Sequence, residues 1–164
     1  MYIPNVSVKV EITSLVGVRL GVKSGAETVN FDVKAKLEEK ERKSQMVILD
    51  FKLLLSTKPS IVKFEVEGTA TLTGKDSEIN KMLETDPETK VPYVFQRVYQ
   101  HVFTATYLIS TILNVPPPPG DLLFPHRQGI PVEDISVELG AESEETTSTQ
   151  SASEEKNEID VSKK

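Results

Sequence analysis

The amino-acid sequence predicts an α+β domain in which a four-stranded antiparallel sheet is packed with a short helix and a long helix. Three observations support this prediction. Apolar residues recur with period two through the first half of the chain, residues 93–114 show helical periodicity, and acidic residues gather after residue 132. We therefore assign residues 1–132 to one domain and residues 133–164 to a disordered acidic C-terminal tail.

Four segments show the alternation of apolar and polar residues that is typical of a strand with one buried face. They cover residues 6–12, 29–37, 47–55 and 62–72. Short connections between consecutive strands favour antiparallel pairing. The third strand is also apolar on its second face, at Met46, Ile48 and Leu54, which predicts that it is covered on both sides. The three glycines within residues 15–28 indicate a bend, a bulge or a long connection, and the charged residues 38–43 suit a turn.

Two helices are expected after the fourth strand. Asp76 or Ser77 can cap a short helix over residues 78–84. Residues 93–114 would form a helix about 33 Å long, with apolar residues on roughly half of its circumference. Contact with one sheet needs a narrower stripe, so the surplus predicts a second surface, most simply the same helix of another subunit. A helix sunk deeper into its own domain is the alternative. The residues expected at the oligomer interface are Val98, Val102, Ala105, Ile109 and Ile112.

Charge and composition exclude several classes of function. The net charge is −6, but the 32 residues from Glu133 carry ten acidic and three basic side chains, which leaves a nearly neutral body. A body without clustered Lys and Arg argues against a nucleic-acid partner. The sequence shows neither a signal segment nor an apolar run of 18 residues, so we expect a cytoplasmic protein without membrane insertion.

The residue types that carry catalysis or bind metals are sparse. There is no cysteine, and the two histidines, His101 and His126, have no second ligand at a helix or strand spacing. No nucleophile elbow, P-loop or glycine-rich phosphate loop occurs. Glu65 and Glu67 share a strand face with Lys63, which is more typical of a solvated surface than of acid and base catalysis. We therefore expect no enzyme activity, no cofactor and no metal.

The acidic tail has no aromatic residue and few apolar ones, so it cannot bury enough surface to offset the entropy of ordering. We expect it to be mostly disordered and to keep the protein soluble; a specific docking peptide is the alternative. Before the tail, the prolines at 116–119 predict a rigid spacer that folds the next segment back across the body. A polyproline ligand for an SH3-like module is the alternative there.

Several local sequences resemble the SecB family of protein-export chaperones. Residues 64–74 are similar to that family's Glu/Val-rich strand, with a glycine midway and a glycine at its end. Val91-Pro92-Tyr93 is similar to the Phe-Pro-Tyr that opens the family's long helix. Pro117-Pro118 and Asp121-Leu122-Leu123-Phe124 are similar to its Phe-Pro-Pro and Asp-Ala-Leu-Phe stretches. The resemblance covers about residues 5–125.

The resemblance implies a homotetramer, built as a dimer of dimers with the long helices sandwiched between sheets. It also implies an ATP-independent holdase that binds unfolded polypeptides in exposed apolar grooves, with a translocation motor as a further partner in protein export. The candidate residues for unfolded-peptide binding are Phe31, Val33, Met82, Leu83, Leu122, Leu123 and Phe124. Each of them, taken alone, also has the plainer interpretation of a core residue.

Two other classes of function remain open. A sheet curled around the long helix would enclose a cavity for a small apolar ligand, and such a carrier is expected to be a monomer or a dimer. A non-catalytic assembly adaptor would instead bind its partner through the proline run or through the strand face of Lys63, Glu65 and Glu67.

Overall fold

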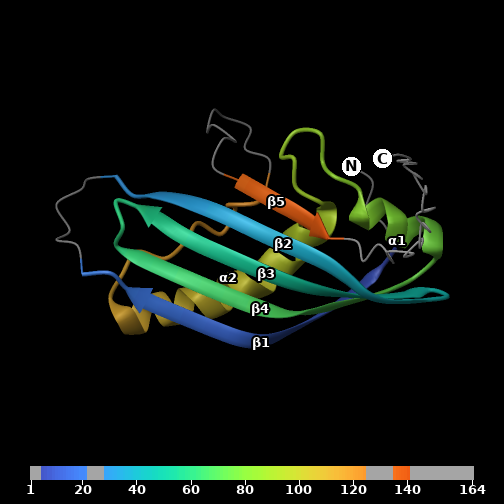
Figure 1. The fold of residues 1–164 in the computed structure, drawn as a ribbon, viewed down its shortest axis with the longest axis horizontal. Coiled ribbons are helices and arrows are strands. Elements are labelled where there is room, and N and C mark those ends of the chain that lie inside the picture. The colour runs from blue at the N-terminus through green and yellow to red at the C-terminus, as the bar shows by residue number, and fades with distance from the viewer. Residues whose placement is uncertain (1–4, 22–27, 125–134, 141–164) are drawn as a thin grey trace, which may run out of the picture.

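The computed structural model describes residues 5–21, 28–124 and 135–140 (Figure 1). Its elements, in chain order, are β1 (Ser7–Arg19), β2 (Asn30–Lys43), β3 (Met46–Lys58), β4 (Val62–Thr73), α1 (Asp76–Leu83), α2 (Tyr93–Leu113) and β5 (Ile135–Gly140). The predicted α+β class is confirmed. Strands β1 to β4 form an antiparallel sheet, and a short helix and a long helix follow them.

The sheet has the strand order β1-β4-β3-β2-β5 and contains a fifth strand that the sequence analysis missed. β5 pairs in parallel with β2, from Val33 opposite Ile135 to Glu38 opposite Gly140. The expectation of disorder therefore does not hold for residues 135–140, while the rest of the tail lies outside the described residues. The segment Ile-Ser-Val-Glu-Leu-Gly has the period of a strand, and the edge of β2 supplies its backbone partners.

The described residues form two layers, because α2 crosses one face of the sheet, with α1 beside the β2–β3 turn, and none of these elements covers the other face (Figure 1). Side chains on the covered face form the core, and burial alternates along β2, β3 and β4 as predicted. Met46, Ile48 and Leu54 lie half-buried on the open face. Within the described residues no helix lies over them, so the second cover expected for this strand is absent from this part of the chain.

Three boundaries differ from the sequence prediction. β1 continues beyond residue 12 to Arg19, and its bulge lies between Ile12 and Ser14, before the three glycines. β2 continues to Lys43 through the charged stretch expected as a turn, because Lys43 still pairs with Met46 of β3. α1 begins at Asp76 and has no side-chain cap at Lys75. The Asp76 carboxylate instead accepts a hydrogen bond from the backbone N–H of Gln45, at 3.0 Å, and so ties the helix to the β2–β3 turn.

The C-terminal end of α2 lies against edge strand β1. A Cβ built at Gly17 would overlap Ile109 Cγ2 and lie 3.0 Å from Leu113 Cδ1, so only glycine allows this close approach. Arg19 donates a hydrogen bond to the Leu113 carbonyl at 3.4 Å. These contacts fix which face of α2 points away from the sheet.

The segment after α2 folds back over the helix, as the proline run predicts. Asn114 ends the helix in the left-handed conformation, with φ of 52°. The Tyr99 hydroxyl donates a hydrogen bond to the Pro119 carbonyl at 2.5 Å, Gly120 lies against the Phe103 ring, and Leu123 is fully buried. Burial, and then the nearby charge of Asp121, raise the pKa of Tyr99 above its usual range. None of the helices in the described residues has the length and apolarity needed to cross a membrane.

Candidate functional site

Exposed large apolar side chains are concentrated on two elements of the described chain, and these two elements lie side by side (Figure 1). We call Val16, Val18 and Leu20 the β1 apolar row. We call Tyr107, Leu108 and Ile112 the α2 apolar face. Scattered exposed apolar residues are ordinary, but six of them along one edge of a sheet indicate an interaction surface.

The β1 apolar row results from a β-bulge. Before the bulge, Val10 and Ile12 pair with Ala70 and Gly68 and face the core. One extra residue between Ile12 and Ser14 shifts the register, so that Val16 and Val18 pair with the outward-facing Glu65 and Lys63. The even-numbered residues of β1 therefore change from the inner face to the open face, where Val16 and Val18 are 47% and 44% exposed.

β1 is also an open edge of the sheet. β4 pairs with it on one side, and no strand of the described residues pairs with it on the other. An open edge presents backbone N–H and C=O groups that can pair with another extended chain. Unlike a protected edge, this part of β1 carries apolar residues rather than lysines at its outward positions.

The α2 apolar face results from an unexpected rotation of the helix. Thr106 and Ser110 are buried. Their burial is tolerated because their hydroxyls donate hydrogen bonds to carbonyls of the same helix, at Val102 (3.0 Å) and Tyr107 (2.7 Å). With these two hydroxyl residues facing the sheet, larger apolar residues face outward. Leu108 is 60% exposed and Ile112 is 81% exposed.

The residues expected at the oligomer interface divide into two groups. Val98 and Val102 are fully buried against their own sheet, which corrects their assignment to an interface between subunits. Ala105 and Ile109 are half-buried, and Ile112 is the most exposed of the five. The alternative of a helix sunk into its own domain therefore describes the first half of α2. Its second half keeps an apolar face that no other described residue covers.

The seven candidate residues for peptide binding also divide. Val33, Met82 and Leu123 are core residues with at most 4% of their surface exposed, so in this conformation they offer nothing to a ligand. The others are half-buried and pack against the core: Phe31 on β2, Leu83 on α1, and Leu122 and Phe124 in the segment after α2. Their role in binding stays a prediction.

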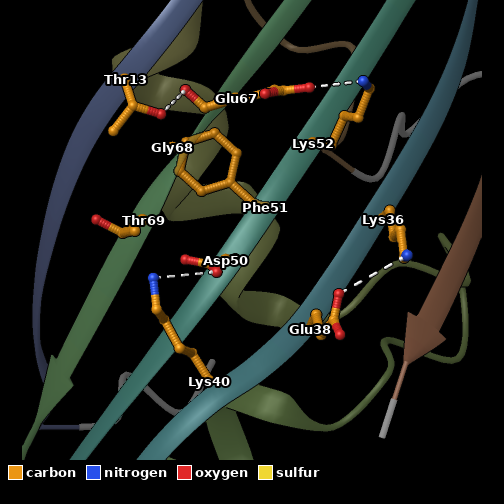
Figure 2. A pocket seen from close by; sticks show the side chains of 10 residues that line it. All are labelled: Thr13, Lys36, Glu38, Lys40, Asp50, Phe51, Lys52, Glu67, Gly68 and Thr69. Carbon is orange, nitrogen blue, oxygen red and sulfur yellow. Dashed lines mark hydrogen bonds and ion pairs between the residues drawn. The ribbon is translucent and has the colours of Figure 1, made fainter. Parts of the chain in front are cut away.

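The open face of the sheet contains a hollow of about 380 Å³ (Figure 2). Its charged side chains pair with each other: Lys36 with Glu38 at 3.7 Å, Lys40 with Asp50 at 3.5 Å, and Lys52 with Glu67 at 2.6 Å. A wall of paired, exposed charges is a solvated surface and gives no support to a carrier of apolar ligands.

Lys52 of β3 bonds to the two glutamates of β4. It contacts both Glu65 and Glu67, because β3 places it directly opposite Glu67. Hydrogen bonds to the two carboxylates raise the pKa of Lys52, and the same contact lowers the pKa of Glu65. Both shifts favour the charged forms of Lys52 and Glu65, so this pair lacks the poised proton that acid and base catalysis requires.

Gly68 lies at the floor of the hollow, beside Phe51 (Figure 2). A Cβ at Gly68 would overlap the Glu11 carbonyl oxygen and lie 2.8 Å from Phe51 Cζ. The missing side chain thus leaves room for the Phe51 ring to cover the gap between two strands, an arrangement known to stabilise glycines within sheets.

His101 is exposed on α2, and His126 lies outside the described residues. In the part of the chain that the structure describes, no three His, Cys, Asp or Glu side chains gather as metal ligands would.

No protein-family model and no curated protein matches this chain. Among solved structures, a SecB-like chaperone of Mycobacterium tuberculosis, in complex with a ChAD peptide from the HigA1 antitoxin, is similar over 69% of this chain and 87% of that chain, with 10% identity and a TM-score of 0.49. A protein of unknown function from Streptococcus agalactiae is similar over 69% of this chain and 95% of that chain, with 16% identity and a TM-score of 0.39. Both TM-scores are below 0.5, so neither similarity decides the function.

Proposed function

We propose that this protein is an ATP-independent holdase chaperone of the cytoplasm, which binds unfolded polypeptides and keeps them from aggregating. The observation that carries the proposal is the β1 apolar row on an open edge strand. A role in protein export, with a translocation motor as partner, is the more specific form of this function.

The chemistry of the edge fits an unfolded chain better than a folded partner. Backbone groups of an edge strand bind any extended segment, whatever its sequence, and alternating apolar contacts add affinity for segments that are apolar themselves. A holdase needs this combination, because it must bind the unfolded state and release the native one. Val16, Val18 and Leu20 supply the apolar contacts, and the free side of β1 supplies the backbone groups.

The α2 apolar face has a separate role in this proposal, as the contact with a second copy of the chain. It lies in the helical layer, whereas the β1 apolar row lies on the open face of the sheet, so one can be covered while the other stays accessible. Leu108 and Ile112 are spaced four residues apart on one helix face, which suits packing against another helix. A homotetramer, formed as a dimer of dimers, would bury this face and raise the avidity for one client chain.

The test is an aggregation assay with a chemically unfolded client and no nucleotide, run beside a measurement of the oligomer's mass. The first variant replaces Val16, Val18 and Leu20 with threonine, which keeps strand propensity and removes apolar surface. Its matched control replaces Lys9 and Glu11, which lie on the same face of β1, with threonine. The second variant carries Leu108→Ser and Ile112→Ser.

Wild type should suppress aggregation, and the β1 variant should need at least five times more protein for the same suppression at an unchanged mass. The control should match wild type. The α2 variant should lower the mass of the oligomer. The holdase proposal is wrong if wild type assembles and yet leaves aggregation unchanged, or if the β1 variant and its control behave alike.

A further inference from the structure

The second edge of the sheet is occupied by a distant segment of the same chain. β5 is a six-residue strand that pairs in parallel with β2, while every other pair in the sheet is antiparallel. Its extensive contacts are with β2 (Figure 1). A short strand paired on one side is held mainly by its backbone hydrogen bonds, and parallel pairs are somewhat weaker than antiparallel ones. Such a strand is suited to exchange with another.

The register shows what kind of segment this edge accepts. Val33, Ala35 and Leu37 are the buried positions of β2, and they pair with Ile135, Val137 and Leu139. The outward positions Lys34 and Lys36 pair with Ser136 and Glu138. The edge therefore receives a segment in which apolar residues alternate with small or acidic ones.

β2 also has the features of an edge strand that can remain unpaired without pairing to the sheet of another molecule. Lys34 and Lys36 are exposed in the stretch that pairs with β5, and lysines at such positions prevent uncontrolled pairing between sheets. At the other edge, the corresponding outward positions of β1 are Val16 and Val18. The two edges thus differ in their chemistry. The outward positions of β1 after the bulge are apolar, whereas those of β2 opposite β5 are Lys34, Lys36 and Glu38, with Lys36 paired to Glu38. The two lysines favour an acidic residue at the ligand positions opposite them.

We propose that the edge of β2 is a second polypeptide-binding site, that its ligands are extended segments with alternating apolar residues and an acidic residue between them, and that β5 is the chain's own occupant of this site. Because β5 is tethered, its effective concentration is on the order of millimolar, and a free ligand must compete with it. The apparent affinity for the ligand is the intrinsic affinity multiplied by the fraction of time that the edge is free of β5. This inference does not depend on the holdase function, since it requires only peptide binding at β2.

Both tests use a parent chain, the full-length protein with Val16, Val18 and Leu20 replaced with threonine, so that the β1 apolar row adds no binding of its own. The first test measures binding of a fluorescein-labelled peptide with the sequence of residues 133–142 to this parent chain and its variants. Val137→Pro together with Glu138→Pro removes two adjacent backbone donors from β5, so at least one bond to β2 is lost whichever way they point. The matched control carries Glu154→Pro and Glu155→Pro, outside β5. Fluorescence anisotropy should show at least tenfold tighter binding of the peptide by the β5 variant than by the parent chain and the control. Equal affinities for all three proteins would overturn the proposal.

The second test avoids prolines and uses the absence of native cysteine. Lys34→Cys and Ser136→Cys place two thiols at paired positions of β2 and β5, where neighbouring strands approach to about 4.8 Å, within reach of a disulfide. In the oxidised protein β5 is locked in place, so peptide binding at β2 should be lost, and a reductant should restore it. Each single-cysteine variant is the control. Peptide binding that persists in the locked protein contradicts the proposal, and it leaves the aggregation test of the β1 apolar row unaffected.

Discussion

Replacing Gly68 with alanine should destabilise the domain more than any other change of one methyl group in the sheet. The new Cβ would overlap the Glu11 carbonyl oxygen, and it would lie 2.8 Å from Phe51 Cζ and 3.0 Å from Ile12 Cα. Two of these three neighbours are backbone atoms of β1, which cannot move aside by rotating a side chain. β1 must therefore shift outward, and the pairing of Ile12 with Gly68 is disturbed.

The size of the effect follows from three contributions. Overpacking of a tight site costs about 1–3 kcal/mol, and loss of one ladder hydrogen bond costs about 1 kcal/mol. Alanine recovers about 0.4–1 kcal/mol, because it restricts the unfolded chain more than glycine does. The net loss in the free energy of unfolding is about 1–4 kcal/mol, which lowers the urea midpoint by about 0.5–2 M at a typical dependence of 2 kcal/mol per M.

The assay is urea denaturation followed by far-ultraviolet circular dichroism. Gly140→Ala is the matched control, since the nearest atom to a Cβ at that position is Glu38 Cγ at 3.8 Å, an ordinary contact. Its midpoint should equal that of wild type or exceed it by up to about 0.5 M, because only the restriction of the unfolded chain remains. A Gly68→Ala midpoint equal to that of wild type would refute the close approach of β1 and β4 at the bulge, and with it the origin of the β1 apolar row.

Three further predictions concern the segment that folds back over α2. Above pH 10, the free energy of unfolding should fall less steeply in Tyr99→Phe than in wild type. Burial raises the pKa of the Tyr99 hydroxyl in the folded state above its unfolded value of about 10, so the stability that the protonated hydroxyl contributes is complete below that pH and is lost as the pH rises. Thermal melts of both proteins at pH 8 and pH 10.5 measure this difference, and parallel losses would contradict it. Leu123→Ala should cost about 2–5 kcal/mol in urea denaturation, and Leu122→Ala clearly less, since Leu123 is fully buried and Leu122 is half-buried; equal costs would show that the segment does not dock as described. Asn114→Val should cost about 1–2 kcal/mol and Asn114→Gly nothing, because φ at this helix end is 52°; a thermally stable valine variant would argue against the left-handed cap.

Much of the fold could be predicted because its patterns are local. Strands β2, β3 and β4 keep one face buried along most of their length, so the alternation in the sequence matches the burial in the structure. The helices have a period that strands cannot imitate, and the proline run after α2 folds the chain back as expected. β5 was missed because its six residues lie in a segment whose overall composition is typical of disorder.

The surfaces were harder to predict than the elements. Val10 and Val16 have the same parity in the sequence, yet one faces the core and the other the open face, because a bulge lies between them. On α2, Thr106 and Ser110 look polar in the sequence and are buried, because each hydroxyl bonds to a carbonyl of its own helix. Ser14 and Gly17, near the bulge, were the only local signs that the even-numbered residues of β1 change from one face of the sheet to the other.

The sequence alone determined the α+β class, the order of the first four strands and two helices, and the scarcity of residues for catalysis. These properties follow from periodicity and composition, which depend on near neighbours in the chain. Only the tertiary structure decided which apolar residues remain exposed and where the C-terminal strand pairs. Exposure depends on the register between strands and on the rotation of a helix against a sheet, and both are set by contacts between residues that are far apart in the sequence.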